Sequence, residues 1–207
     1  MSITIHGIVA SRAVRPLWAA AELGLAVEHV PTPYKDGATR TPDFLALNPN
    51  GHIPVLVDHR PDGDVVVWES MACTLYVARH HGRGDGTDIA PATAAEDADA
   101  LRWSFWTVTE LEKDALTVLM HRMAMPVDQR KPDLAAAAEK RLHVPLRILE
   151  QQRQRDRGLA HLAAQRFTVA DLCVASVLNW ARPAPHLLSG YPLSDAWLHA
   201  CVNRPAL

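Results

Sequence analysis

The spacing of hydrophobic positions changes once along this chain and divides it into two parts. Up to about residue 82, short apolar runs typical of strands alternate with segments whose apolar residues recur every three or four positions, as in amphipathic helices. After residue 92 the strand-like runs fade and the helical spacing dominates. We therefore expect an α/β domain over residues 1–82, a linker over 83–91 and an all-helical domain over 92–207.

The first part contains both strand and helix signals. Helical spacing is clearest where Val14, Leu17, Trp18 and Ala21 fall on one face, and Gly24 can end this helix. In chain order, we expect a strand at 3–5, a helix from 14, a strand at 27–30, a short helix at 43–47, strands at 55–56 and 65–67, and a helix at 69–81. This succession of a βαβ unit, a helix and a ββα unit is the thioredoxin-like order.

The second part begins after a glycine-rich stretch, because Gly82, Gly84 and Gly86 interrupt all periodicity and mark a linker. Residues 92–125 are expected to be helical throughout, with an interruption at 126–128 and a second helical run over 134–157. Pro145 lies inside that run and is expected to kink or divide it.

One helix start is marked by its own residues. Thr168 can cap the N-terminus, and Asp171 lies three residues later, where its carboxylate can reach back to the Thr168 N–H. Phe167 and Leu172 occupy the positions of a hydrophobic staple. The segment 172–178 is apolar nearly all round, so we expect this helix at the centre of the second domain.

Composition excludes several classes of function. The 207 residues are 48% apolar and 21% charged, which is typical of a globular protein. A net charge of −2 argues against nucleic acid or an acidic membrane as a partner. No apolar run approaches the roughly 20 residues needed to span a bilayer, and the N-terminus lacks the features of a signal peptide. A cytoplasmic location is therefore expected.

Cysteines and histidines give no sign of a disulfide framework or a metal centre. Cys73, Cys173 and Cys201 are odd in number and far apart, and the first two lie in apolar helical stretches where free cysteines commonly pack. The 11 histidines form no HExxH motif and no Cys/His pair at zinc spacing. We expect buried thiols and no metal site.

A candidate binding site comes from two segments of the first part. Residues 48–56, Asn-Pro-Asn-Gly-His-Ile-Pro-Val-Leu, read as a loop that runs into a strand at Pro54. An X–Pro bond can be cis at modest cost, and a turn there leaves backbone groups available to a ligand. Further on, Glu69 and Ser70 open a helix whose free N–H groups can bind an anion. Together the segments predict a site for an extended peptide with a free carboxylate.

These segments resemble the glutathione-binding half of the cytosolic glutathione transferases, in which a loop of the type NPxGxIPVL precedes a Glu-Ser pair. The resemblance covers essentially the whole chain, including the Phe-Thr-Val-Ala-Asp-Leu cap, and implies a thioredoxin-like domain followed by a helical bundle. It implies that Ile53, before a cis Pro54, bonds the cysteinyl part of glutathione through its backbone. It also implies that Glu69 and Ser70 hold the γ-glutamyl end and that the protein is a homodimer without a tightly bound cofactor.

His52 departs from the family pattern, since a lysine is frequent at this position. A neutral imidazole can still donate one hydrogen bond to the glycyl carboxylate of glutathione. We therefore include His52 among the expected glutathione-binding residues.

The resemblance also directs attention to the turn after the first strand, where the family places the group that activates the thiol. A thiol of pKa about 8.5 is mostly protonated at pH 7, and lowering that pKa by about two units requires about 2.7 kcal/mol of differential stabilisation. Residues 6–15 contain no Tyr and no Cys, and Ser11-Arg12-x-x-Arg15 looks like a bacterial serine-type pattern. We expect Ser11 to be catalytic, donating to the glutathione sulfur with the Arg12 N–H close by. The alternative is that Ser11 only caps the first helix, and Pro16 can shift its position.

The second substrate has the weakest signal. Trp103 and Trp106, on the first long helix of the second part, are candidates to contact an apolar electrophile, and core packing is the alternative role. The leading hypothesis is a transferase that adds the glutathione thiolate to a small apolar electrophile. Peroxidase, isomerase and dehalogenase activities stay open, and so does a non-catalytic glutathione-binding or protein-interaction module.

Overall fold

The computed structural model describes residues 2–155, 159–184 and 186–207, which form two compact units. The first unit ends at Ala92, and the second begins at Thr93. None of the described helices is both long and apolar enough to cross a membrane.

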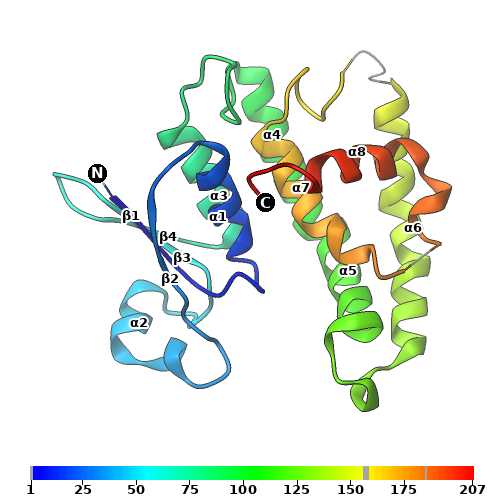
Figure 1. The fold of residues 1–207 in the computed structure, drawn as a ribbon, viewed down its shortest axis with the longest axis horizontal. Coiled ribbons are helices and arrows are strands. Elements are labelled where there is room, and N and C mark those ends of the chain that lie inside the picture. The colour runs from blue at the N-terminus through cyan, green and yellow to red at the C-terminus, as the bar shows by residue number, and fades with distance from the viewer. Residues whose placement is uncertain (1, 156–158, 185) are drawn as a thin grey trace. The chain divides into compact units, whose positions relative to one another are not determined.

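A four-stranded mixed sheet forms the centre of the first unit (Figure 1). Its strands are β1 (Ser2–His6), β2 (Val27–Val30), β3 (Val55–His59) and β4 (Val65–Trp68), in the order β2-β1-β3-β4. β1 pairs parallel with β2 and antiparallel with β3, and β4 pairs antiparallel with β3 at the edge. All four expected strands are confirmed, with the thioredoxin-like order.

The helices of this unit also follow the expected order. They are α1 (Val14–Glu22), the 3-10 turn η1 (Ala38–Arg40), α2 (Pro42–Leu47) and α3 (Ser70–His81). Side chains alternate across β3, so Val55 and Val57 pack with Phe44 of α2 on one face of the sheet. Leu56 points to the other face and is fully buried.

The buried face of α1 differs from the expected one. Trp18 is buried as expected, but Ala21 is exposed, whereas Arg15, Ala19 and Ala20 are buried. The reason is that α1 packs against α3, where small alanines allow close approach and the Arg15 guanidinium finds a polar partner. The helix end is as expected, because Gly24 has a φ of 64° and donates to the Ala21 carbonyl at 3.0 Å.

The buried carboxylate of Asp58 connects β3 to the far end of α3. Its Oδ2 accepts a hydrogen bond from the Tyr76 hydroxyl at 2.8 Å and lies 2.9 Å from His81 Nε2 and 2.8 Å from Arg60 Nε. Burial alone would raise the pKa of Asp58, but the bonds from Tyr76, His81 and Arg60 outweigh it and lower that pKa. The cluster holds α3 on the sheet, away from the loop that contains Pro54.

The second unit is helical. Its α-helices are α4 (Ala94–Trp106), α5 (Glu112–Leu119), α6 (Pro132–Arg155), α7 (Val169–Leu178) and α8 (Pro192–Val202). Two π-helical segments flank α5, η2 (Thr107–Leu111) and η3 (Met120–Ala124), and three 3-10 turns complete the unit, η4 (Val127–Gln129), η5 (Asn179–Ala181) and η6 (Leu188–Gly190).

Two expectations for these helices need correction. The run 92–125 is helical but not uniform, because its hydrogen-bond ladder widens to π-helix at η2 and η3. Pro145 does not divide the second run, since α6 is continuous through it and begins at Pro132. The expected end of this run, at residue 157, lies outside the described residues.

α7 is the central helix of the second unit, as expected, with all ten of its residues buried. Thr168 and Asp171 form a reciprocal capping box, in which the Thr168 N–H donates to Asp171 Oδ2 at 2.9 Å. The two Asp171 oxygens also accept bonds from the Leu162 N–H and the Trp197 indole N–H, both at 2.9 Å. Asp171 therefore holds the helix start, the preceding loop and α8 together.

α8 was not expected from the sequence, and its N-terminus is capped from another helix. The described structure shows no side-chain cap from Tyr191, the residue before this helix. Instead, the buried Glu150 of α6 accepts hydrogen bonds from the N–H groups of Leu193 and Ser194 at 3.0 and 2.8 Å and from the Ser194 hydroxyl at 2.7 Å.

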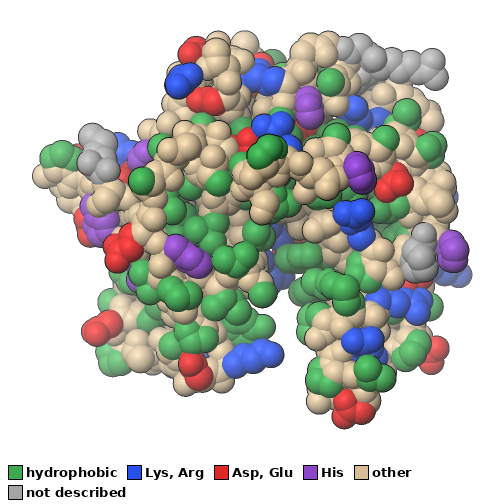
Figure 2. Space-filling view, viewed as in Figure 1, with side chains coloured by type: hydrophobic (Ala, Val, Ile, Leu, Met, Phe, Trp, Pro, Cys, Tyr) green, Lys and Arg blue, Asp and Glu red, His purple; other side chains and the backbone are tan. Residues whose placement is uncertain are grey.

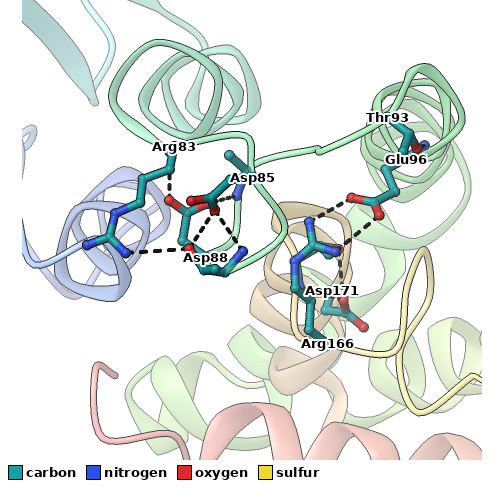
Figure 3. A network of polar contacts seen from close by, with 10 residues as sticks. Arg83, Asp85, Asp88, Thr93, Glu96, Arg166 and Asp171 are labelled. Atoms are coloured by element: carbon teal, nitrogen blue, oxygen red, sulfur yellow. Dashed lines mark hydrogen bonds and ion pairs between the residues drawn. The ribbon is translucent and has the colours of Figure 1, made fainter.

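The glycine-rich stretch after α3 is ordered by aspartates, and Figure 3 shows this part of the first unit. Asp88 accepts bonds from the N–H groups of Arg83 at 2.7 Å and Ala90 at 2.8 Å, and Asp85 accepts one from the Thr87 N–H at 2.9 Å. Within the second unit, the same figure shows Arg166 paired with Glu96 of α4.

Candidate functional site

The turn after β1 and the loop before β3 lie against each other in the first unit. Gly7 is in a left-handed conformation (φ 138°), and a Cβ built on it would stand 2.7 Å from the Ala13 Cβ and 3.3 Å from the Ile53 Cβ. Only a glycine allows this approach. The structure thus brings the segment that contains Ser11 close to Ile53.

Ser11 lies in the turn that leads into α1. Its hydroxyl donates to the Ile8 carbonyl at 2.6 Å and accepts from the Ala13 N–H at 3.1 Å. Both bonds belong to a local serine turn and not to a helix cap, because the N-cap position of α1 is Ala13 and no side chain among the described residues caps this helix. The side chain is half-buried, as is the neighbouring Arg12. The hydroxyl can therefore reach a ligand only by redirecting its proton from the Ile8 carbonyl.

The Ile53–Pro54 peptide bond is cis, as expected. The buried Asn48 holds the loop before it, since its amide nitrogen donates to the His52 carbonyl at 2.8 Å and its Oδ1 accepts from the Asn50 N–H at 3.0 Å. Within the described residues, no backbone hydrogen bond involves the N–H or C=O of Ile53. Both groups are available to pair with an extended ligand, and the His52 side chain is exposed beside them.

Glu69 and Ser70 occupy the N-terminus of α3. Glu69 has a φ of 71°, and among the described residues it is the only non-glycine in the left-handed region. Such a conformation costs of order 1–3 kcal/mol and is frequent at ligand sites. The Glu69 carboxylate is exposed, whereas Ser70 is buried and its Oγ accepts a hydrogen bond from Arg15 Nη1 at 2.7 Å.

Two arginines near this site were not among the expected binding residues. Arg15 is fully buried and contacts Ser70. Arg40 donates to the Asn50 carbonyl at 3.1 Å, and its guanidinium lies directly against Gly51. The sequence placed Arg15 four residues after Ser11, which was the one available signal. The sequence spacing gave no sign that Arg40 would contact the loop that precedes Pro54.

Trp103 and Trp106 lie on α4 of the second unit, with ring centroids 5.1 Å apart in an edge-to-face arrangement. Trp103 is 5% exposed and Trp106 is half-buried, whereas Phe105 between them is 65% exposed. Hydrophobic side chains reach the surface at many places on the face drawn in Figure 2. Of the two expected electrophile contacts, Trp106 offers more surface to a ligand than Trp103.

The cysteines are not placed to take the catalytic role expected of Ser11. All three cysteines are buried thiols, as expected. Cys73 of the first unit donates its thiol to the Val67 carbonyl at 3.3 Å. Burial raises its pKa to about 12, so it stays a protonated thiol at neutral pH.

Among the described residues, one group of side chains has the composition of a metal site, His161, Asp171 and Cys201 in the second unit. Both Asp171 oxygens already accept hydrogen bonds from the capping box, the Leu162 N–H and the Trp197 indole. A metal ion would have to displace these bonds, so the arrangement serves the helix cap.

A thioredoxin-like domain with a cis-proline loop, joined to an all-helical domain, is the architecture of the two-domain transferases that the sequence resembles. The comparison with known families agrees for both units. Residues 1–79 match the family described as "Glutathione S-transferase, N-terminal domain", and residues 109–205 match "Glutathione S-transferase, C-terminal domain". The chain belongs to the glutathione S-transferase family.

Curated relatives and solved structures agree with this assignment. Glutathione S-transferase 3 of Zea mays is 35% identical over 191 residues, covering 89% of this chain and 82% of the relative. Glutathione S-transferase GstB of Escherichia coli K12 is 27% identical over 194 residues, covering 90% of this chain and 86% of its own. The structure of glutathione S-transferase III in apo form superposes with a TM-score of 0.82 at 32% identity, covering 100% of this chain and 94% of its own.

Proposed function

We propose that this chain is a serine-type glutathione transferase, which binds glutathione on its first unit and adds the thiolate to a small apolar electrophile. The observation that carries the proposal is the close packing of the turn that contains Ser11 with the Ile53 side chain at Gly7. In this proposal, the Ser11 hydroxyl would lie beside a cysteinyl residue paired with Ile53. The names of the relatives, all glutathione S-transferases, support the same activity.

Glutathione would lie extended along the loop that contains Pro54. Its cysteinyl residue would exchange hydrogen bonds with the N–H and C=O of Ile53, as an added antiparallel strand does. Its γ-glutamyl carboxylate would lie at the N-terminus of α3, where free N–H groups and the Ser70 hydroxyl favour an anion. The Glu69 carboxylate would accept from the γ-glutamyl ammonium.

The glycyl carboxylate would lie at the other end of the site. His52 is exposed there, and the Arg40 guanidinium lies against Gly51 in the same loop. Arginine stays charged across the physiological pH range. Arg40 therefore supplies a positive charge at this end of the site, and we add it to the proposed binding residues.

Ser11 would stabilise the thiolate. The thiol proton leaves to solvent, and the sulfur then accepts a hydrogen bond from the Ser11 hydroxyl and the Arg12 N–H. The Ser11 proton must turn from the Ile8 carbonyl toward the sulfur, which exchanges a bond to a neutral acceptor for one to an anion. The thiolate electron pair then forms the new S–C bond, and in a displacement the leaving group departs with its bonding pair.

The test is turnover with glutathione and a chlorodinitrobenzene by Ser11→Ala, Ser11→Thr and Ser189→Ala. The control is matched, because the exposed Ser189 hydroxyl also donates to a carbonyl three residues earlier, that of His186 at 2.8 Å. We expect Ser11→Ala to lose at least tenfold in kcat and Ser11→Thr to retain much of it, with Ser189→Ala unchanged. Full turnover by Ser11→Ala would leave Ser11 with only its local turn contacts.

A glutathione-binding module without catalysis is the alternative, and the Ser11–Ile8 hydrogen bond favours it because the hydroxyl is already engaged. Tight glutathione binding without conjugation across a panel of electrophiles would support the module. Glutathione-dependent peroxidase, isomerase and dehalogenase activities belong in the same panel. The proposal includes a homodimer, a cytoplasmic location and the electrophile contacts Trp103 and Trp106, all on the family resemblance, and the dimer is testable by sedimentation.

A further inference from the structure

A buried arginine behind the Glu69–Ser70 pair has no role in the proposed chemistry. Arg15 of α1 is 0% exposed and Ser70 is 5% exposed. Arg15 Nη1 donates to Ser70 Oγ at 2.7 Å, between two helices that pack against each other. Burying a guanidinium is costly, so its position calls for a reason beyond packing.

The direction of this hydrogen bond is fixed by chemistry. A guanidinium has only donors, whereas a serine hydroxyl has one donor and two acceptor positions. Ser70 Oγ must therefore be the acceptor, and its own proton points away from Arg15. No acceptor for that proton is present among the residues that the structure describes.

Among the Ser70 groups, the carbonyl is already bonded, which leaves the hydroxyl proton and the backbone N–H as the available donors. The carbonyl accepts from the Thr74 hydroxyl at 2.7 Å. Ser70 is the first residue of α3, where the N–H groups have no carbonyl partner within the helix. The hydroxyl proton and these N–H groups together form a set of donors suited to one carboxylate.

We propose that Arg15 is a positioning residue that commits the Ser70 hydroxyl to donate to the γ-glutamyl α-carboxylate of glutathione. The inference rests on the proposed function. It makes Arg15 a determinant of specificity for that carboxylate, acting through Ser70 without touching the ligand. Arginine suits this role because it stays charged and cannot accept a hydrogen bond. The Ser70 hydroxyl therefore accepts from Arg15 and is left to donate its own proton at every physiological pH.

The experiment compares two ligands by calorimetry with the full chain: glutathione and γ-aminobutyryl-cysteinyl-glycine, which lacks only the α-carboxylate. Wild type is expected to prefer glutathione by about tenfold or more. Arg15→Met is expected to weaken glutathione about tenfold and to leave the analogue unchanged, so the preference disappears. Arg15→Lys, which keeps one donor for Ser70, is expected to retain part of it. Arg141→Met, which removes an exposed arginine of the second unit, should retain all of it.

Coupling and kinetics separate positioning from a structural role. Adding Arg15→Met to Ser70→Ala is expected to weaken glutathione by less than twofold further, because both changes remove the same donor. KM for glutathione should rise while kcat at saturation changes less than twofold, and the thiolate absorbance of bound glutathione should titrate as in wild type. Equal weakening of both ligands, additive effects or a shifted thiolate titration would each overturn the inference.

Three further outcomes are distinguishable. If Arg15→Met does not fold, Ser70→Ala and Arg15→Lys decide, and a wild-type preference in Ser70→Ala would refute the inference. If wild type binds neither ligand, the proposed function itself fails. If wild type binds glutathione with a preference that Arg15 variants do not change, only the role of Arg15 is wrong.

Discussion

Glu150→Gln tests whether α6 caps α8, and its effect can be worked out from the structure. The carboxylate accepts three hydrogen bonds, from the N–H groups of Leu193 and Ser194 and from the Ser194 hydroxyl, at 2.7–3.0 Å in a buried position. Glutamine keeps the volume but removes the charge, and it turns an NH₂ group toward at least one of these donors.

The expected loss follows from those contacts. A hydrogen bond to a charged group contributes about 1.5–3 kcal/mol, and a negative charge at a helix N-terminus adds about 0.3–1 kcal/mol. Partial compensation by the glutamine oxygen leaves about 2–4 kcal/mol of lost stability for Glu150→Gln. For a chain of this size that corresponds to a melting temperature lower by about 4–16 °C.

Urea and thermal unfolding at pH 7 measure the loss, and hydrogen exchange of the Leu193 and Ser194 amides locates it. Ser194→Ala, which keeps both amide bonds, should cost about 1 kcal/mol. Glu110→Gln, at an exposed glutamate of the same unit, should change stability by less than about 0.5 kcal/mol. If Glu150→Gln unfolds like Glu110→Gln and the two amides exchange as in wild type, Glu150 does not cap α8.

Three other changes have definite expected outcomes. Gly7→Ala should abolish measurable glutathione binding by calorimetry, because its Cβ would stand 2.7 Å from that of Ala13 and force the turn away from Ile53; wild-type affinity would contradict this. Cys73 should resist iodoacetamide in the native protein. Burial raises the pKa of Cys73 to about 12 in the folded protein, compared with about 9 in the unfolded chain. The contribution of Cys73 to stability is therefore complete below pH 9 and declines as the pH rises from 9 toward 12. Unfolding experiments across that pH range would measure the decline. Arg40→Met should raise the dissociation constant of glutathione several-fold, and more at low salt, whereas an unchanged constant would remove Arg40 from the site.

The order of elements could be predicted because each carries its own local signal. β2 and the start of α7 have the expected residues, since a short run bounded by Val27 and Val30 and a Thr-x-x-Asp cap are both local in sequence. The buried face of α1 could not be predicted, because the buried Arg15 bonds to Ser70, which is 55 residues away in the sequence. α8 was missed for a similar reason, since its cap comes from Glu150 on another helix.

The site was predictable to the same extent. The helix start near Ser70 follows from local sequence, whereas the cis bond at Pro54 was expected from the family resemblance, because the local sequence only allows it. The hydrogen bond from Ser11 to the Ile8 carbonyl and the position of Arg40 beside Gly51 depend on the folded turn and loop. Sequence therefore supplied the candidate binding groups, and the structure was needed to find the residues that contact them.

The left-handed backbone of Glu69 has a consequence for how the site responds to its ligand. The strain at Glu69 is already present in the folded chain, so the N-terminus of α3 does not need to be reshaped when a carboxylate arrives. A glycine at this position would relieve the strain and leave the backbone more conformations to sample. Domain stability thus favours a glycine at position 69, whereas a ready-formed anion site favours the strained Glu69.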